Sequence, residues 1–117
     1  MEQALSELKT QTWLAEYLPT WQVHNGIIKR VFKTGSWRLT MMVANSIAYL
    51  AEAADHHPNL LLSYTSVEIH LETHSAGGIT NKDLELAQKI EETITWYPAA
   101  NNALDGAKKE NWLKPDA

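Results

Sequence analysis

The sequence contains no cysteine. Disulfide bonds, iron–sulfur clusters and thiolate zinc sites are therefore excluded, and any metal site would have to rely on histidine and carboxylate ligands. A basic excess is also missing, because the chain carries a net charge of −4. Proteins that bind nucleic acid use such an excess to neutralise phosphate groups, so we expect no direct nucleic-acid partner.

Long apolar runs are missing as well. No stretch approaches the roughly 18 apolar residues that a membrane-spanning helix needs. The first residues, MEQALSELKTQTW, have neither the basic segment nor the unbroken apolar segment of a signal peptide. The motifs of nucleophilic hydrolases, P-loops and dinucleotide-binding sites are also absent from the sequence. We therefore expect a cytoplasmic protein without a membrane partner.

What is present is an ordinary globular composition. The chain has 117 residues, of which 44% are hydrophobic and 21% are charged. This is enough for one compact core and too little for two, so we expect a single domain over 1–97. The polar stretch 98–117 is expected to form a C-terminal tail, either loose or with one short helix held by Trp112 and Leu113.

Hydrophobic periodicity predicts the first elements of the fold. Apolar residues recur at helical spacing from Glu2 to Leu18, and Pro19 ends the pattern. Two strand-like runs follow at 21–24 and 27–32. They are separated by Asn25-Gly26, which is a strong signal for a tight antiparallel hairpin.

A second helix is predicted after Ser36, a good N-cap residue, and it should end near His56. A short third strand is expected over 60–65. The third helix is predicted to continue through 84–94, after a cap at Thr80.

The run 67–74 has the alternation of a strand with one buried face. Its two faces are Val67, Ile69, Leu71 and Thr73 on one side, and Glu68, His70, Glu72 and His74 on the other. The predicted order is thus α-β-β-α-β-β-α, which indicates an α+β fold with a four-stranded antiparallel sheet and three helices on one face. Exposed edge strands favour pairing between copies, so we expect a homodimer or homotetramer.

Two adjacent histidines, His56 and His57, follow the second helix, and Pro58 comes directly after them. The residue before a proline is pushed out of the helical region, so His57 should be extended. Histidine exchanges a proton readily near neutral pH, and the carbonyl end of a helix favours a protonated imidazole. One of the pair could therefore donate a proton to a substrate, or both could simply cap the carbonyls of the helix end.

The other histidines give weaker signals. His74 precedes a glycine-rich turn, where it could face a cleft or simply be exposed to solvent. His70 and His74 would pair as metal ligands on a helix, but on a strand they lie about 13 Å apart, so we expect no metal site. Glu68 and Glu72 have the same spacing, so we interpret them as separate solvated charges and not as a carboxylate pair. His24, in the first hairpin, is interpreted as a surface or structural residue.

One pattern closely resembles the signature of the pterin-4a-carbinolamine dehydratases. It consists of Glu52-x3-His56-His57-Pro58, followed by Tyr64, His74 and Asp83 at the spacings of that family. The resemblance covers the order of elements from about Leu5 to Ile94. The chain departs from it at Thr65-Ser66, where many members have Asn-Lys, and at Ser75, where many members have an acidic residue.

The resemblance implies an enzyme that removes water from 4a-hydroxytetrahydrobiopterin to give quinonoid dihydropterin. This reaction lets aromatic amino acid hydroxylases recycle their cofactor. A pterin substrate is implied, with no metal and no bound cofactor. The chemistry is reasonable for histidine, because dehydration needs one proton delivered and another removed, and an imidazole can do both near neutral pH.

The resemblance also implies roles for individual residues. His56 and His74 would act as acid and base, one helping hydroxide leave C4a as water and the other taking the N5 proton. His57 would complete the catalytic histidines and mainly position the pterin. The other implied substrate contacts are Pro58, Thr73, Ser75 and Ala76, and the residues implied to orient the imidazoles are Glu52 and Asp83.

An alternative function comes from the same resemblance. Some relatives of this family bind other proteins: one steadies the dimer of a transcription factor, and others look like Rubisco assembly chaperones. A non-catalytic binding or assembly partner on the same scaffold is therefore the second hypothesis. The chaperone-like relatives tend to have altered active-site residues, whereas His56, His57 and His74 are all present here.

Overall fold

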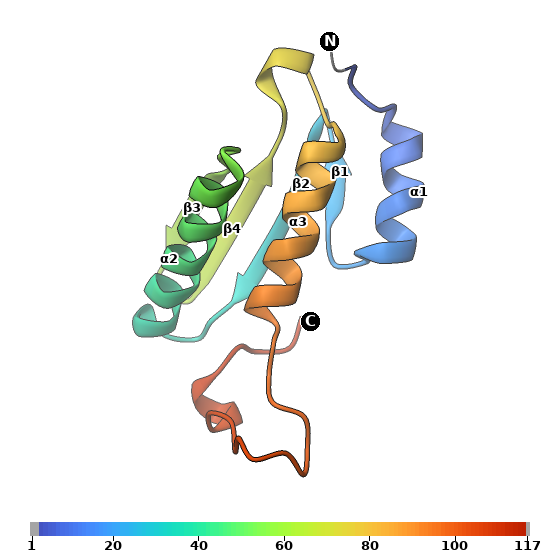
Figure 1. Ribbon diagram of the computed structural model, residues 1–117. Helices are drawn as coiled ribbons and strands as arrows, with labels where there is room; N and C mark the ends of the chain where they lie inside the picture. Colours follow the sequence, from blue (N-terminus) through green and yellow to red (C-terminus); the bar gives the residue numbers. More distant parts are fainter. Residues whose placement is uncertain (1–2, 117) are drawn as a thin grey trace.

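The computed structural model describes residues 3–116 and has the predicted order of elements (Figure 1). In chain order these are α1 (Glu7–Tyr17), β1 (Gln22–His24), β2 (Ile27–Lys33), α2 (Trp37–Ala54), β3 (Asn59–Ser63), β4 (Ser66–Leu71), the 3-10 turn η1 (His74–Ala76), α3 (Asn81–Ile94) and the 3-10 turn η2 (Lys109–Asn111). The first helix begins later than predicted, because residues 3–6 are not helical and Ser6 caps α1 at Glu7. Met1, Glu2 and Ala117 lie outside the described residues. Within residues 3–116, no helix has the length and apolar character needed to cross a bilayer.

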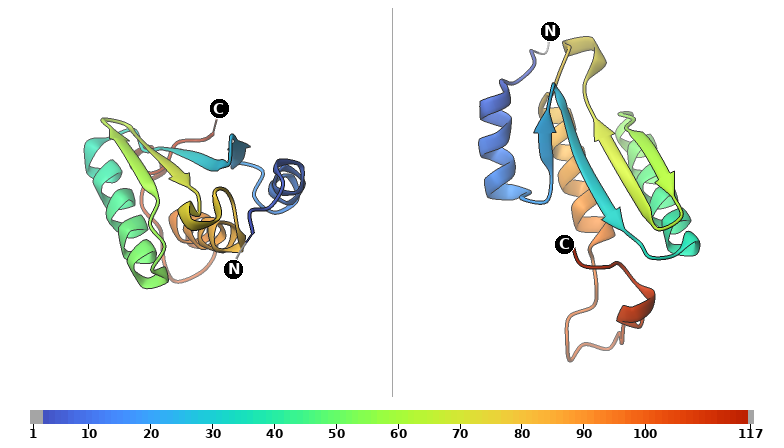
Figure 2. Two further views of the ribbon diagram at one scale, coloured as in Figure 1. Left: turned by 90° about the horizontal axis from the view of Figure 1, so that it is seen from above. Right: turned by 180° about the vertical axis from the view of Figure 1, so that it is seen from behind.

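The four strands form one antiparallel sheet in the order β1-β2-β4-β3. Two hairpins, β1–β2 and β3–β4, are joined in the centre by the pairing of β2 with β4. All three long helices lie on one side of the sheet: α2 and α3 cover its face, and α1 lies beside β1 (Figure 2, left). The α+β prediction is therefore confirmed, and the other face of the sheet is left open.

The core lies between the sheet and the helices. The predicted alternation in β4 is confirmed, because Val67, Ile69 and Leu71 are completely buried. Facing them are the buried apolar positions of α2 and α3, which are Leu39, Val43, Ile47, Leu84, Ala87 and Ile90. Burial of a large apolar side chain contributes roughly 1.5–3 kcal/mol, so this layer fixes α2 and α3 against the sheet.

The first hairpin turns as its sequence predicts. Asn25 has φ 51° and Gly26 has φ 76°, and two consecutive left-handed residues are what a type I′ turn requires. Gly26 also lies against the turn that follows β4, since a Cβ atom built on Gly26 would be 3.7 Å from the Cα of Gly78. The tip of the β1–β2 hairpin is therefore packed beside η1.

The second helix ends as predicted, just before the two histidines. Ser36 caps its start by accepting a hydrogen bond from the Leu39 N–H. At the other end Asp55 adopts the left-handed conformation, with φ 52°. The backbone N–H groups of Asp55 and His56 donate to carbonyls of the last helical turn. The Nε2 atoms of His56 and His57 bond to the carboxylates of Asp83 and Glu52 and not to these carbonyls.

The fourth strand is shorter than predicted. It ends at Leu71, and His74 lies in the 3-10 turn η1 rather than on the strand. The reason is a tight loop: the Thr73 N–H donates to the Gly78 carbonyl over 2.8 Å, and the two residues form an isolated β-bridge. The bridge closes the glycine-rich segment into a turn that carries His74 away from the sheet.

The C-terminal tail folds back onto the domain. It contains η2, and Trp112 and Leu113 are partly buried against the core. Its anchors are polar as well as apolar: the Lys114 N–H donates to the Lys33 carbonyl over 2.8 Å, and Asp116 accepts a hydrogen bond from the Arg30 guanidinium over 2.6 Å.

Candidate functional site

The predicted site residues lie where three elements meet. His56 and His57 follow the end of α2, Thr73 and His74 follow β4, and Asp83 lies in the first turn of α3. Figure 1 shows the end of α2, the η1 turn and the start of α3 at the same end of the molecule. The short loops at these three ends therefore determine where the functional side chains lie.

Asp83 is the buried centre of this region, with an exposed fraction of 0%. Its Oδ2 accepts hydrogen bonds from the Thr73 hydroxyl over 2.7 Å and from the Thr80 N–H over 2.9 Å. The bond from Thr80 belongs to the capping box that begins α3, so the helix start itself fixes the carboxylate. Its other oxygen, Oδ1, is left to bind His56.

His56 is held by that oxygen. Its Nε2 lies 2.6 Å from Asp83 Oδ1, and the imidazole is mostly buried, with 15% of the side chain exposed. An ionised carboxylate can only accept, so Nε2 carries the proton of this bond. The other ring nitrogen, Nδ1, is then the one with a free lone pair, which makes His56 an oriented proton acceptor.

His57 and His74 each have a carboxylate partner as well, but they lie at the surface. His57 Nε2 is 2.9 Å from Glu52 Oε1, and its side chain is 57% exposed. His74 Nδ1 is 2.9 Å from Glu72 Oε1, and its side chain is 96% exposed. The site thus contains one fixed imidazole and two that solvent or a ligand can reach.

Two residues, Asp83 and Thr73, connect His56 to the backbone position of His74. Thr73 directly precedes His74, and its hydroxyl bonds to the same Asp83 that holds His56. That hydroxyl is also 2.7 Å from the Thr80 hydroxyl. Thr73 is buried and its side chain is therefore already committed within the protein, which favours a positioning role over direct contact with a substrate.

The remaining predicted contacts surround this region. Ser75 is exposed and Ala76 is half-buried within η1, and Pro58 is half-buried where α2 passes into β3. A hollow of about 240 Å³ lies beside His74. It is lined by Asn25, Gly26, Glu72, His74, Gly77 and Gly78. Exposed backbone groups at Gly77 and at the hairpin tip could bind a polar ligand there.

Glu72 is the residue that the sequence interpretation missed. The strand pattern favours a solvated charge at Glu72, yet the Glu72 carboxylate bonds to His74. The signal was available, because the alternation placed Glu72 and His74 two residues apart on the same face. Glu52 and Asp83, by contrast, lie against the imidazoles that the resemblance implied they orient.

A metal centre finds no support among the described residues. Within 3–116 there is no group of three or more histidine, aspartate or glutamate side chains arranged to hold an ion. His70 does not approach His74, but bonds through Nε2 to Glu68 over 2.6 Å. The imidazoles of the site can transfer protons and can donate or accept hydrogen bonds.

The chain is similar both to a known protein family and to individual proteins. The family described as Pterin 4 alpha carbinolamine dehydratase matches residues 3–93. A protein of Aquifex aeolicus, named provisionally as a pterin-4-alpha-carbinolamine dehydratase, is 43% identical over 94 residues, which cover 80% of this chain and 94% of that protein. A protein of Chloroflexus aurantiacus with the same provisional name is 40% identical over 90 residues, covering 77% and 96%.

Solved structures give the same fold. A crystal structure of a transcriptional coactivator/pterin dehydratase from Brucella melitensis superimposes with a TM-score of 0.69 at 30% identity, covering 75% of this chain and 95% of the other. A pterin dehydratase-like protein identified as a RuBisCO assembly factor in the alpha-carboxysome has a TM-score of 0.51 at 22% identity, covering 61% and 82%. At that identity the second likeness shows a shared fold alone.

Proposed function

The chain belongs to the pterin 4 alpha carbinolamine dehydratase family, and we propose that it removes water from a 4a-hydroxytetrahydropterin to give the quinonoid dihydropterin. The observation that carries the proposal is the network in which Asp83 binds His56 on one oxygen and Thr73, the neighbour of His74, on the other. This network fixes the His56 imidazole and anchors the residue that precedes His74 in the chain.

The reaction is a pair of proton transfers around one breaking bond. The C4a–O bond breaks, and the hydroxyl leaves as water after receiving a proton. The proton on N5 is removed, and its electron pair forms the C4a=N5 double bond. No electrons or other groups are exchanged with a second molecule. An acid beside the C4a hydroxyl and a base beside N5–H are therefore sufficient.

We assign these two roles to His56 and His74. His56 offers Nδ1, because Nε2 is bonded to Asp83. His74 offers Nε2, because Nδ1 is bonded to Glu72. Each carboxylate fixes the orientation of its imidazole and stabilises the imidazolium form. The base reaches this form when it takes the N5 proton, and the acid starts from it and loses a proton to the departing hydroxyl. Positioned acid–base groups of this kind contribute typically about 10²–10⁴ in rate.

Binding of the pterin is assigned to the surrounding surface. His57 is accessible and oriented by Glu52, so it can bond to the polar edge of the ring. Pro58, Ser75 and Ala76 would form the walls, together with the backbone of the glycine turn. Thr73 would act through Asp83 and not through the substrate.

The test is turnover of a synthetic 4a-hydroxytetrahydropterin, followed by the loss of its absorbance. The wild-type protein should speed this loss, and His56→Ala or His74→Ala should each remove most of the acceleration. Glu85→Gln, which changes an exposed carboxylate on α3, is the control and should leave the rate unchanged. A wild-type protein that is folded but gives only the spontaneous rate would reject the proposal and favour the non-catalytic binding or assembly role.

We further propose a cytoplasmic homo-oligomer. The edge strands β1 and β3 have unpaired sides in the single chain, and Leu61 of β3 and Tyr49 of α2 are exposed apolar side chains. Such surfaces favour association between copies. Sedimentation analysis should give the mass of a dimer or tetramer, and a stable monomer at micromolar concentration would contradict this proposal.

A further inference from the structure

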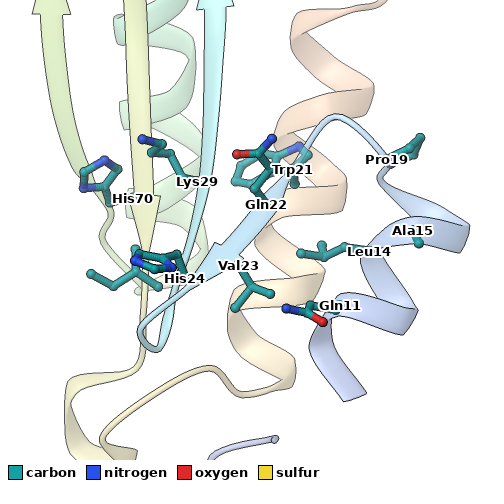
Figure 3. Close-up of a pocket in the computed structure, with 11 residues that line it drawn as sticks. Gln11, Leu14, Ala15, Pro19, Trp21, Gln22, Val23, His24, Lys29 and His70 are labelled. Atoms are coloured by element: carbon teal, nitrogen blue, oxygen red, sulfur yellow. The ribbon is translucent and has the colours of Figure 1, made fainter. Parts of the chain in front are cut away.

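A second hollow, larger than the one beside His74, lies between α1 and the sheet. It has a volume of about 650 Å³ and is formed by α1, β1 and the open face of β2 and β4 (Figure 3). Its lining includes neither His56, His57 nor His74, and it shares no residue with the hollow beside His74. Sites for small molecules typically have volumes of about 300–1,000 Å³, so this groove has the size of a ligand site.

The floor of the groove is apolar and rigid. Leu14 and Trp21 are each 2% exposed and belong to the core, and Val23 of β1 packs against them. The Trp21 indole N–H donates to Glu91 over 2.8 Å, so its polar atom is already satisfied. The accessible apolar surface of the groove comes from Ala15, Pro19, Val23 and Ile27, and it suits an apolar or aromatic ligand body.

The rim of the groove is polar, and its arrangement follows from the strand register. Lys29 of β2 pairs directly with His70 of β4 and with Gln22 of β1. Directly paired residues point to the same face of a sheet, so these three side chains form one row across the open face. Figure 3 shows Lys29, His70 and His24 on the same side of the strands.

Most of these rim groups lack a protein partner. Within residues 3–116, the side chains of Lys29, His24, Gln11 and Gln22 make no hydrogen bond or ion pair. His70 is bonded to Glu68 through Nε2, which leaves its Nδ1 without a partner. Several donors are thus available above an apolar floor.

The charge of the groove differs in sign from that of the whole protein. Its lining contains one lysine and two histidines but neither aspartate nor glutamate, whereas the chain carries a net charge of −4. A cation beside a desolvated apolar wall attracts an anion more strongly than one that is fully surrounded by water. The expected ligand therefore combines a negative group with an apolar body.

We propose that this groove binds a small carboxylate with an aromatic ring system. The carboxylate would accept hydrogen bonds from the Lys29 ammonium, with Gln22 and His70 beside it. The ring would lie on the accessible apolar side chains Pro19, Val23 and Ile27. This site is separate from the histidine site and goes beyond the proposed dehydratase function.

The probe for this proposal is 2-naphthoate, compared with its uncharged analogue 2-naphthamide. Titration of the wild-type protein, followed by isothermal calorimetry and by backbone amide shifts, should show saturable binding of 2-naphthoate at one site per chain. The shifts should be largest in α1, β1 and β2. Because the amide lacks the charge that Lys29 recognises, 2-naphthamide should bind about ten-fold more weakly, which corresponds to about 1.4 kcal/mol.

Variants locate the site. Lys29→Gln should weaken 2-naphthoate binding by about ten-fold and abolish the preference for the carboxylate over the amide. Lys33→Gln, an exposed lysine on the same strand and face that does not line this groove, should leave binding unchanged. Ala15→Phe, which adds a ring to the exposed α1 wall, should also weaken binding. His74→Ala should leave 2-naphthoate binding unchanged, because His74 lies outside the groove.

Three results would overturn the proposal. They are no saturable binding of 2-naphthoate in wild-type protein, equal affinity for the acid and the amide, and equal effects of Lys29→Gln and Lys33→Gln. Pterin turnover is measured separately. Failure of 2-naphthoate to bind would leave the dehydratase assignment intact, and a lack of pterin turnover would leave the groove proposal intact.

Discussion

The imidazole of His56 and the carboxylate of Asp83 are joined by a hydrogen bond of 2.6 Å, and Asp83 is completely buried. A buried carboxylate is costly unless all its oxygens have partners. Here the Thr73 hydroxyl, the Thr80 N–H and the imidazole supply them. The same pair therefore serves the start of α3 and the orientation of a proposed catalytic group.

Asp83→Asn tests this orientation. The amide oxygen can still accept from Thr73 and Thr80, and the amide N–H₂ would then face His56 Nε2. That nitrogen would have to accept, so the imidazole proton would move to Nδ1, which is the nitrogen assigned to the substrate. We expect kcat to fall by about 10²-fold or more while the chain stays folded.

The measurement for Asp83→Asn is pterin turnover together with thermal unfolding by circular dichroism. Glu85→Gln is the matched control, since it makes the same chemical change at an exposed position of α3. A variant at residue 83 that is as active as the control would show that the His56 tautomer does not matter.

Glu72→Gln tests the pairing that fixes His74. Both side chains lie near the surface, so the free energy of unfolding should change by less than about 0.5 kcal/mol. The rate should fall by about ten-fold, because the neutral amide does not stabilise the imidazolium form of His74. Glu72→Asp should recover part of the activity. An unchanged pH–rate profile in Glu72→Gln would count against a role for this carboxylate.

Thr73→Val tests the link between the two histidines. The substitution keeps the shape but removes the hydroxyl that donates to Asp83, which should cost about 1–3 kcal/mol in the free energy of unfolding. Activity should fall as well, since Asp83 would lose a fixed partner. Thr73→Ser retains the hydroxyl and should retain most of the rate. The account fails here if Val and Ser variants are equally active and equally stable in urea unfolding.

Arg30 offers a test of stability far from the histidines. It is buried, and its guanidinium bonds to Glu91 through two nitrogens and to Asp116 of the tail. Burial would lower the pKa of Arg30, but the hydrogen bonds to Glu91 and Asp116 outweigh it, so the pKa is raised above its usual range. The group therefore stays charged at every pH at which the protein would be handled.

Arg30→Met should lower the free energy of unfolding by about 3 kcal/mol, because Glu91 would lose its charged partner in a largely buried position. Asp116→Asn should cost only about 0.5 kcal/mol, because Asp116 is half-exposed and Arg30 keeps its bonds to Glu91. Urea unfolding of both variants is the measurement. Equal losses would mean that the tail, and not Glu91, is the main partner of Arg30.

Much of this fold could be predicted because its signals are local. The Asn25-Gly26 turn, the cap at Ser36 and the cap at Thr80 each depend on a few adjacent residues, and all three lie where they were predicted. Hydrophobic periodicity identified every long helix and every strand. Element ends were less accurate, because they depend on contacts made elsewhere in the chain.

The features that could not be predicted depend on distant partners. β4 ends early because Thr73 bridges to Gly78, and nothing in the strand pattern indicates that bridge. Arg30 lies in a strand as predicted for 27–32, but the strand pattern does not indicate that its buried guanidinium pairs with Glu91, far along the chain. The groove beside Trp21 likewise exists only once α1 and β1 are packed.

The candidate site could be predicted only in part from the sequence. Its histidines and the carboxylates Glu52 and Asp83 follow from the resemblance, whereas their pairing and the contribution of Glu72 needed coordinates. The exposed fractions of the three imidazoles, which separate one fixed group from two accessible ones, also required the packed structure.

The most direct test of the central claim is the rate of 4a-hydroxytetrahydropterin loss for the His56→Ala/His74→Ala double variant, compared at equal concentration with wild-type protein of the same folded content. The account predicts that the double variant gives no more than the spontaneous rate, while the wild-type protein is faster by a factor of about 10² or more. A double variant as fast as the wild-type protein would contradict it.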